Sequence, residues 1–127
     1  MTEIKGYHAH VYYNAATRRI AEGLRETLIG RFAVKPGGFS DEPRGPHPIS
    51  QFNVIFETGE FPKIVPWLML NRTGLTVLVH PNTSRPRSDH LLHSLWLGEV
   101  LPILHPEELA ESNDPASRIV PNTTVAP

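Results

Sequence analysis

The chain has 127 residues, 39% of them hydrophobic, and a formal net charge of −1 with its seven histidines neutral. This length suits one domain with a single core, and the charge indicates neither a nucleic-acid nor an acidic-membrane partner. The lack of cysteine excludes disulfides and thiolate sites, so any metal must be bound by imidazole and oxygen. Because the sequence shows neither a signal peptide nor an apolar run long enough to span a membrane, we expect a soluble cytoplasmic protein.

The first predicted element is a strand over residues 7–13, which are rich in aromatic and β-branched side chains. Successive strand side chains point to opposite faces, so His8, His10 and Tyr12 share one face. Two histidines in an H-x-H pattern are a common way to offer metal ligands, but the pattern also occurs by chance. How strongly the H-x-H pattern indicates a metal site depends on whether other possible ligands in the chain lie near it.

An amphipathic helix is predicted to follow, because Ile20, Leu24 and Leu28 recur at steps of four. Asn14 is expected to act as its N-cap and Gly30 to end it. The alternation over residues 31–35 then predicts a short strand.

Residues 36–48 show no periodicity and contain four prolines. A structureless run of this length inside a small domain is usually functional or disordered. Its histidine, His47, lies between Pro46 and Pro48, which hold the backbone extended. We therefore expect a stiff loop that presents His47 and covers a site.

The remaining elements are a strand at 49–57, a helix at 59–72, a strand at 75–80 and a turn at 81–83. Pro66 predicts a kink or a late start in the second helix. A loop is expected at 84–88, and residues 89–98 read either as a short helix or as a fifth strand, of which we favour a strand from His93. One domain is predicted over residues 1–105. Residues 106–127 are predicted to be an extended tail outside the core, helical at most around 107–111.

This order of elements predicts an α+β fold, the ferredoxin-like βαββαβ sandwich. We expect an antiparallel sheet with two helices on one face and a possible extra edge strand. The first and third strands are expected to lie parallel in the centre, with the fourth strand antiparallel beside the first. Four histidines then meet at one end of the uncovered sheet face: His8, His10, His47 and His80. Apolar residues on that face predict a homodimer that shields it, namely Tyr12, Ile55 and Leu78.

A group of imidazoles without thiolates suits Fe(II), Zn(II), Cu(II) or Ni(II). Two or three histidines with a carboxylate and open positions favour non-haem Fe(II), whereas the same ligands with one bound water favour zinc hydrolysis. The candidate carboxylates are Asp41, Glu42, Glu57, Asp89 and Glu99. Two alternatives therefore stay open beside an iron enzyme: a zinc hydrolase, and a non-catalytic dimeric binding module whose histidines are incidental.

Four blocks of this sequence, at residues 8–13, 41–48, 78–83 and 89–99, resemble the DOPA 4,5-dioxygenase family in the same order. The resemblance covers about residues 4–105. It implies a ferredoxin-like fold, a bound Fe(II), and an extradiol-type reaction in which O2 opens the ring of a catechol such as DOPA to a semialdehyde. Zinc or nickel is a possible metal in the protein as purified.

The histidine-bearing blocks of the family carry over onto His8, His10, His47 and His80, with His90 and His93 behind them. We predict roles for individual residues in three groups, of which the first would bind the metal: His10, His47 and His80. The second group would act in catalysis, with an unligated histidine as general base: His8, His93 and His90. The third group would contact the substrate, an arginine pairing with its carboxylate: Arg44, Arg72 and Asn53.

Overall fold

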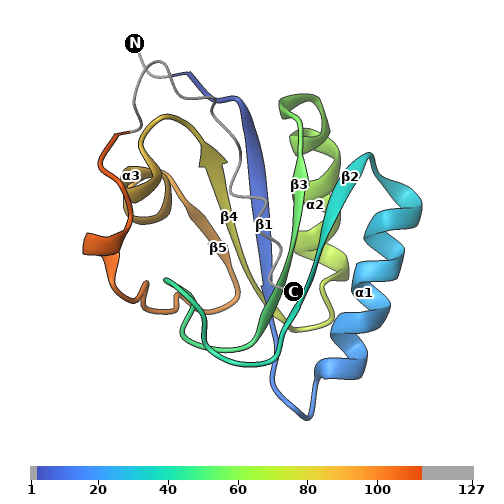
Figure 1. The fold of residues 1–127 in the computed structure, drawn as a ribbon. Helices are drawn as coiled ribbons and strands as arrows, with labels where there is room; N and C mark the ends of the chain where they lie inside the picture. The colour runs from blue at the N-terminus through green and yellow to red at the C-terminus, as the bar shows by residue number, and fades with distance from the viewer. Residues whose placement is uncertain (1–2, 113–127) are drawn as a thin grey trace.

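The structure, a computed structural model, describes residues 3–112. An antiparallel sheet of five strands, in the order β2-β3-β1-β4-β5, is combined with three α-helices, which confirms the predicted α+β class (Figure 1). The elements are, in chain order, β1 Gly6–Tyr12, α1 Arg18–Arg31, β2 Val34–Ser40, β3 Gln51–Phe56, the 3₁₀-helix η1 Thr58–Glu60, α2 Phe61–Asn71, β4 Thr76–Asn82, α3 Pro86–Leu91, β5 Leu95–Leu97 and the 3₁₀-helix η2 Pro106–Glu108.

Helices α1 and α2 pack on the same face of the sheet, where they build the hydrophobic core (Figure 1). The strands contribute the odd-numbered residues of β1 and the alternate residues of β3 and β4 that the period of two predicts. The core side chains are Ala9, Val11, Tyr13, Ala21, Leu24, Leu28, Phe52, Val54, Phe56, Ile64, Val65, Leu68, Leu75, Val77 and Val79.

The central strands β1 and β3 run antiparallel, so the expectation of a parallel pair is wrong. Tyr7 pairs with Phe56 and Tyr12 with Gln51, which sets the start of β3 beside the end of β1. The segment before β3, which carries His47, therefore starts from the opposite end of β1 to His8. Because β4 is also antiparallel to β1, His80 does pair directly with His8, as expected.

The second face of the sheet, expected to be uncovered, is buried by the chain itself. Loop 41–50, helix α3 and the segment after β5 lie over it, and the backbone N–H of Leu104 donates to the carbonyl of Pro46. Tyr12, Ile55 and Leu78 are buried in the single chain. The homodimer was inferred from the exposure of this face, and the face is covered within one chain. A homodimer would therefore have to form through another surface.

Several element boundaries differ from the predicted ones. Strand β2 extends through Pro36 as far as Ser40, so almost half of the expected loop is an edge strand with an irregular register between Pro36 and Phe39. Strand β4 continues to Asn82 instead of ending at His80. These strands are longer because edge and bulge positions tolerate proline and glycine, residues that usually mark loops.

The helices differ as well. Helix α1 begins at Arg18, and Asn14 instead accepts a hydrogen bond from the backbone of Thr17 in the turn before it. Helix α2 runs through Pro66. Both alternatives considered for residues 89–98 occur, since α3 lies at 86–91 and β5 at 95–97.

Of the predicted tail, residues 106–112 are described and the rest lies outside the described residues. This first part is held against α3, because the Arg87 guanidinium donates to the carbonyls of Pro106, Glu107 and Leu109. Within residues 3–112, no helix is both long and apolar enough to cross a membrane.

Candidate metal centre

Three buried histidines from three different elements converge on the second face of the sheet. His10 lies on β1, His80 on the neighbouring strand β4, and His90 on α3, which packs over that strand. One ring nitrogen from each lies within 4.8 Å of the others, an arrangement able to hold a metal ion. A buried group of this kind exists because the register of β1 and β4, in which His80 pairs with His8 and His10 with Leu78, makes His10 and His80 diagonal neighbours on one face, and the short helix supplies the third residue.

Each of the three rings is oriented by a hydrogen bond at Nδ1. His10 bonds to the side-chain oxygen of Gln51 at 2.9 Å, His80 to the carbonyl of Pro81 at 2.9 Å, and His90 to the carbonyl of Pro86 at 2.7 Å. These oxygens only accept, so each Nδ1 must carry the proton and each neutral ring keeps its lone pair on Nε2. Metal-binding histidines characteristically have such an acceptor behind the ligating nitrogen.

The contact between the Nε2 atoms of His10 and His80 measures 3.1 Å. With both protons on Nδ1, two lone pairs face each other here, which is unfavourable unless something positive lies between them. Two nitrogen ligands about 2.1 Å from one metal ion, at an angle between about 90° and 109°, are separated by about 3.0–3.4 Å. The observed separation is thus the one that a shared ion requires, and the residues present fit a divalent metal.

The charge states of the buried histidines also suit a bound divalent metal ion. Burial, together with the neighbouring histidines, holds the pKa of His10 and that of His80 well below 6.5. Burial lowers the pKa of His47 to about 3 and also lowers that of His90. All four imidazoles are therefore neutral at neutral pH, which is the form that binds metal ions.

His47 lies beside the three histidines without being one of them. Its ring centre is 4.1 Å from that of His10, and its Nδ1 is hydrogen-bonded to the Tyr12 hydroxyl at 2.7 Å. The Tyr12 ring in turn stacks on Trp96 of β5 at 5.9 Å. His47 reaches this place because its loop folds back over the sheet face, from the opposite end to that assumed in the sequence argument.

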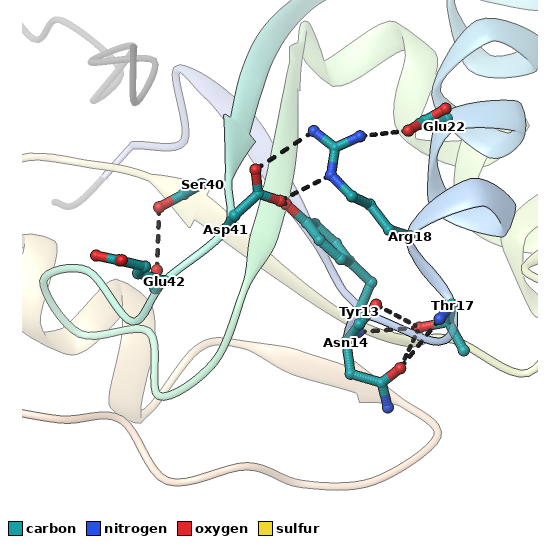
Figure 2. A network of polar contacts seen from close by, with 8 residues as sticks. All are labelled: Tyr13, Asn14, Thr17, Arg18, Glu22, Ser40, Asp41 and Glu42. Carbon is teal, nitrogen blue, oxygen red and sulfur yellow. Dashed lines mark hydrogen bonds and ion pairs between the residues drawn. The ribbon is translucent and has the colours of Figure 1, made fainter.

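The loop that carries His47 is anchored where it leaves β2. Figure 2 shows Asp41 between two partners: it accepts a hydrogen bond from the Tyr13 hydroxyl at 2.6 Å and one from Nε of Arg18 at 2.8 Å. Arg18 also pairs with Glu22 on α1. At its tip the loop closes a tight turn, in which Arg44 and His47 exchange backbone hydrogen bonds. The loop is therefore fixed at both its base and its tip.

His8 is completely buried and stacks on both His10 and His80, with ring centres 5.4 and 5.0 Å apart. Its Nδ1 is hydrogen-bonded to the side-chain oxygen of Asn82 at 2.7 Å. His8 thus lies directly against the candidate metal centre, as the sequence predicted.

Asn53 pairs across the sheet with His10, and its side-chain oxygen is buried without a hydrogen-bond partner. A side chain at Gly37 would come within 2.7 Å of that oxygen, so the β2 backbone closes over this amide. The unpartnered oxygen thus lies against β2, and it is the strand pairing that puts Asn53 beside His10 on the histidine-bearing face of the sheet.

The other expected site residues lie elsewhere. His93 is exposed, beyond the end of α3, and lines a cavity of about 380 Å³ with Tyr7 and Phe61, on the helix-covered side of the sheet. Arg72 donates to the carbonyl of Met69 at the end of α2. Arg44 is exposed at the tip of the His47 loop.

Of the candidate carboxylates, Asp89 is buried and the other four are exposed. Sequence reasoning did not assign a role to Gln51, Asn82 or Thr83, which support the histidines or Asp89. The alternation of β3 placed Gln51 on the correct face, and this was the signal that could have identified it.

The comparisons with known proteins agree with this geometry. A family model described as the Dopa 4,5-dioxygenase family matches residues 7–106. The chain belongs to the Dopa 4,5-dioxygenase family. It is 32% identical over 111 residues to the DOPA 4,5-dioxygenase of Amanita muscaria, covering 80% of this chain and 49% of that protein.

Two further proteins are similar to this chain. An uncharacterized 21.2 kDa protein of Botryotinia fuckeliana is 34% identical over 109 residues, covering 76% of this chain and 60% of that one. A crystal structure described as a "putative dioxygenase" from Nostoc punctiforme is 52% identical, with a TM-score of 0.78, covering 79% of this chain and 87% of that one. The chain thus spans about half to three fifths of the length of the curated relatives that it matches.

Proposed function

We propose that this chain is a non-haem Fe(II) dioxygenase of the extradiol type. In the proposed reaction both atoms of O2 enter a catechol such as DOPA, one ring bond next to the hydroxyls breaks, and a ring-opened semialdehyde acid forms. The observation that carries the proposal is the buried set of three imidazoles with ring nitrogens within 4.8 Å of one another, each with its Nδ1 proton engaged, and with the Nε2 atoms of His10 and His80 facing each other. The strand order further supports a ferredoxin-like topology with β5 as an added edge strand.

The residues that would hold the iron are His10, His80 and His90. His90 thereby takes the ligand role expected for His47, because it belongs to the group within 4.8 Å. A three-nitrogen site without thiolates leaves positions open, and iron bound there would supply Lewis acidity and one-electron chemistry toward O2. Zinc offers no redox chemistry, so the same ligands would not support this reaction with zinc.

His47 is the best-placed proton acceptor for a catechol hydroxyl. It is neutral at neutral pH, lies against His10, and is held by Tyr12. In the tautomer whose Nδ1–H donates to the Tyr12 oxygen, Nε2 is the atom that accepts the proton. His8, in contact with His10 and His80, is the second histidine of the predicted catalytic group that lies at this centre.

The walls of the site suit a planar aromatic substrate. Tyr12 and Trp96 stack beside His47, and rings of this kind bind other aromatic rings through offset or tilted stacking. Asn53, beside His10 on the same face of the sheet, stays the candidate for a hydrogen bond to a substrate hydroxyl. Arg44, on the tip of the His47 loop, stays the candidate for pairing with a substrate carboxylate.

The experiment that tests the proposal uses protein purified without a histidine tag and loaded with Fe(II) under reducing conditions. On exposure to air with DOPA, caffeate or catechol, a yellow product absorbing where the catechol does not is expected. Methylating one hydroxyl of the substrate should abolish the product, because extradiol cleavage requires both oxygens. Replacing Fe(II) with Zn(II) should abolish it too. A protein that is active with zinc as a hydrolase and inactive with iron on every catechol would contradict the proposal.

A further inference from the structure

Asp89 is the one carboxylate that is buried in the part of the chain described, with only 2% of its surface exposed. It directly precedes His90 in α3. A buried carboxylate is costly unless it is paired or hydrogen-bonded. A buried carboxylate next to a candidate metal ligand therefore needs a structural or functional explanation.

Both oxygens of Asp89 are bound by one residue at the end of β4. The backbone N–H of Thr83 donates to Oδ2 at 2.9 Å, and the Thr83 hydroxyl donates to Oδ1 at 2.5 Å. The same hydroxyl oxygen accepts from the backbone N–H of Arg85 at 3.0 Å. This clamp ties α3 to the strand that carries His80, three residues before Thr83.

Helix α3 has six residues, too few to be stable on its own. Two attachments fix it: the clamp to Thr83 on one side, and the contacts of Arg87 with residues 106–111 on the other. The position of the His90 ring relative to His80 thus depends on the clamp. The two ring centres are 4.0 Å apart.

Charge gives a second, independent argument. Three neutral imidazoles would leave the two positive charges of a divalent ion uncompensated in a buried site. Asp89 is the buried negative charge nearest in sequence to one of the ligands, and its attraction for a cation is strong where water is excluded. Residues that orient metal ligands typically change metal affinity by one to two orders of magnitude when they are mutated.

We propose that Asp89, held by Thr83, is the positioning residue of the metal centre: it fixes His90 against His10 and His80 and supplies negative charge for a divalent cation. This inference rests on the proposed metal site and not on the identity of the reaction. Asp89 is not among the residues whose ligand atoms lie within 4.8 Å of one another, which are His10, His80 and His90, so it acts on the centre through His90.

The test measures Co(II) binding to the full-length protein, stripped of metal, by calorimetry and by the visible absorption of the bound ion. Asp89→Asn should weaken binding by about 10- to 100-fold. Thr83→Val keeps the charge and loses both hydrogen bonds of the hydroxyl, the one to Asp89 and the one from the backbone N–H of Arg85, so it should weaken binding by up to about tenfold. Thr83→Ser keeps the hydroxyl and should bind as the wild type does. Glu26→Gln is the matched control, because it removes an exposed carboxylate on α1, which has no part in fixing α3, and it should bind as the wild type does.

A changed Co(II) spectrum in Asp89→Asn, with fold and melting temperature kept, would support the inference, since a purely structural residue would not alter the ligand field. Equal affinity and spectra in wild type and Asp89→Asn would overturn it, while leaving the metal site in place. If Asp89→Asn does not fold, wild-type affinity in Thr83→Val overturns it instead. Absence of Co(II) binding by the wild type would overturn this inference and the proposed function together.

Discussion

Acid should destabilise the metal-free protein through its buried histidines, well above the pH at which carboxylates protonate. Burial lowers the pKa of His47 from 6.5 to about 3. Above pH 6.5 this imidazole is neutral in the folded and the unfolded chain and adds no pH dependence. Below pH 6.5 the unfolded chain binds a proton that the folded chain does not, so stability falls as the pH falls.

The size of this destabilisation follows from how far the pKa of His47 is lowered. One histidine lowers the free energy of unfolding by about 1.4 kcal/mol per pH unit, and by about 5 kcal/mol once pH 3 is reached. The pKa values of His10, His80 and His90 are also lowered, so these residues act in the same direction. Since a domain is stable by only about 5–15 kcal/mol, most of the stability should be lost above pH 4.

The assay is urea unfolding followed by tryptophan fluorescence, with a chelator present, at several pH values between 7.5 and 5. His47→Gln should reduce the slope of stability against pH by about 1.4 kcal/mol per unit. A free energy of unfolding that stays constant from pH 7 to 5 in the wild type would refute the reasoning.

Two further predictions concern single side chains. His90→Ala should abolish stoichiometric iron binding while circular dichroism shows an intact fold. His93→Ala should bind iron normally, because His93 lies on the other side of the sheet. If His90→Ala bound iron with wild-type affinity, His90 would be removed from the ligands. Tyr12→Phe removes the hydroxyl bonded to His47 and should lower kcat by about tenfold or more with iron affinity little changed. An unaltered kcat would show that this hydrogen bond has no part in the reaction.

The sequence predicted the parts of the fold that depend on periodicity. Alternation along residues 7–13 placed His8, His10 and Tyr12 on one face. The steps of four identified Leu24 and Leu28 on the buried side of α1, although Ile20, the first residue of that series, is exposed. These patterns are local, so they survive any error in topology. The direction of β3 relative to β1 was predicted wrongly, because pairing direction follows from the connections between strands and not from the pattern within them.

The ligand group was harder to predict for two reasons. Helix α3 is too short to show a helical period, and His90 and His93 differ by only three positions, so the sequence alone gave no way of telling which faces the centre. The burial of the histidine face was missed as well. Loop 41–50 has no periodicity, and its path across the sheet depends on contacts with residues distant in sequence, such as Leu104.

The most direct test of the central claim, that a catechol is opened at an iron held by His10, His80 and His90, is oxygen uptake measured together with catechol loss. Iron-loaded wild-type protein should consume one O2 for each catechol molecule converted. The His90→Ala variant, folded and treated in the same way, should consume none above the rate of free iron. No uptake by the wild type across several catechols, or equal uptake by the variant, would contradict the account.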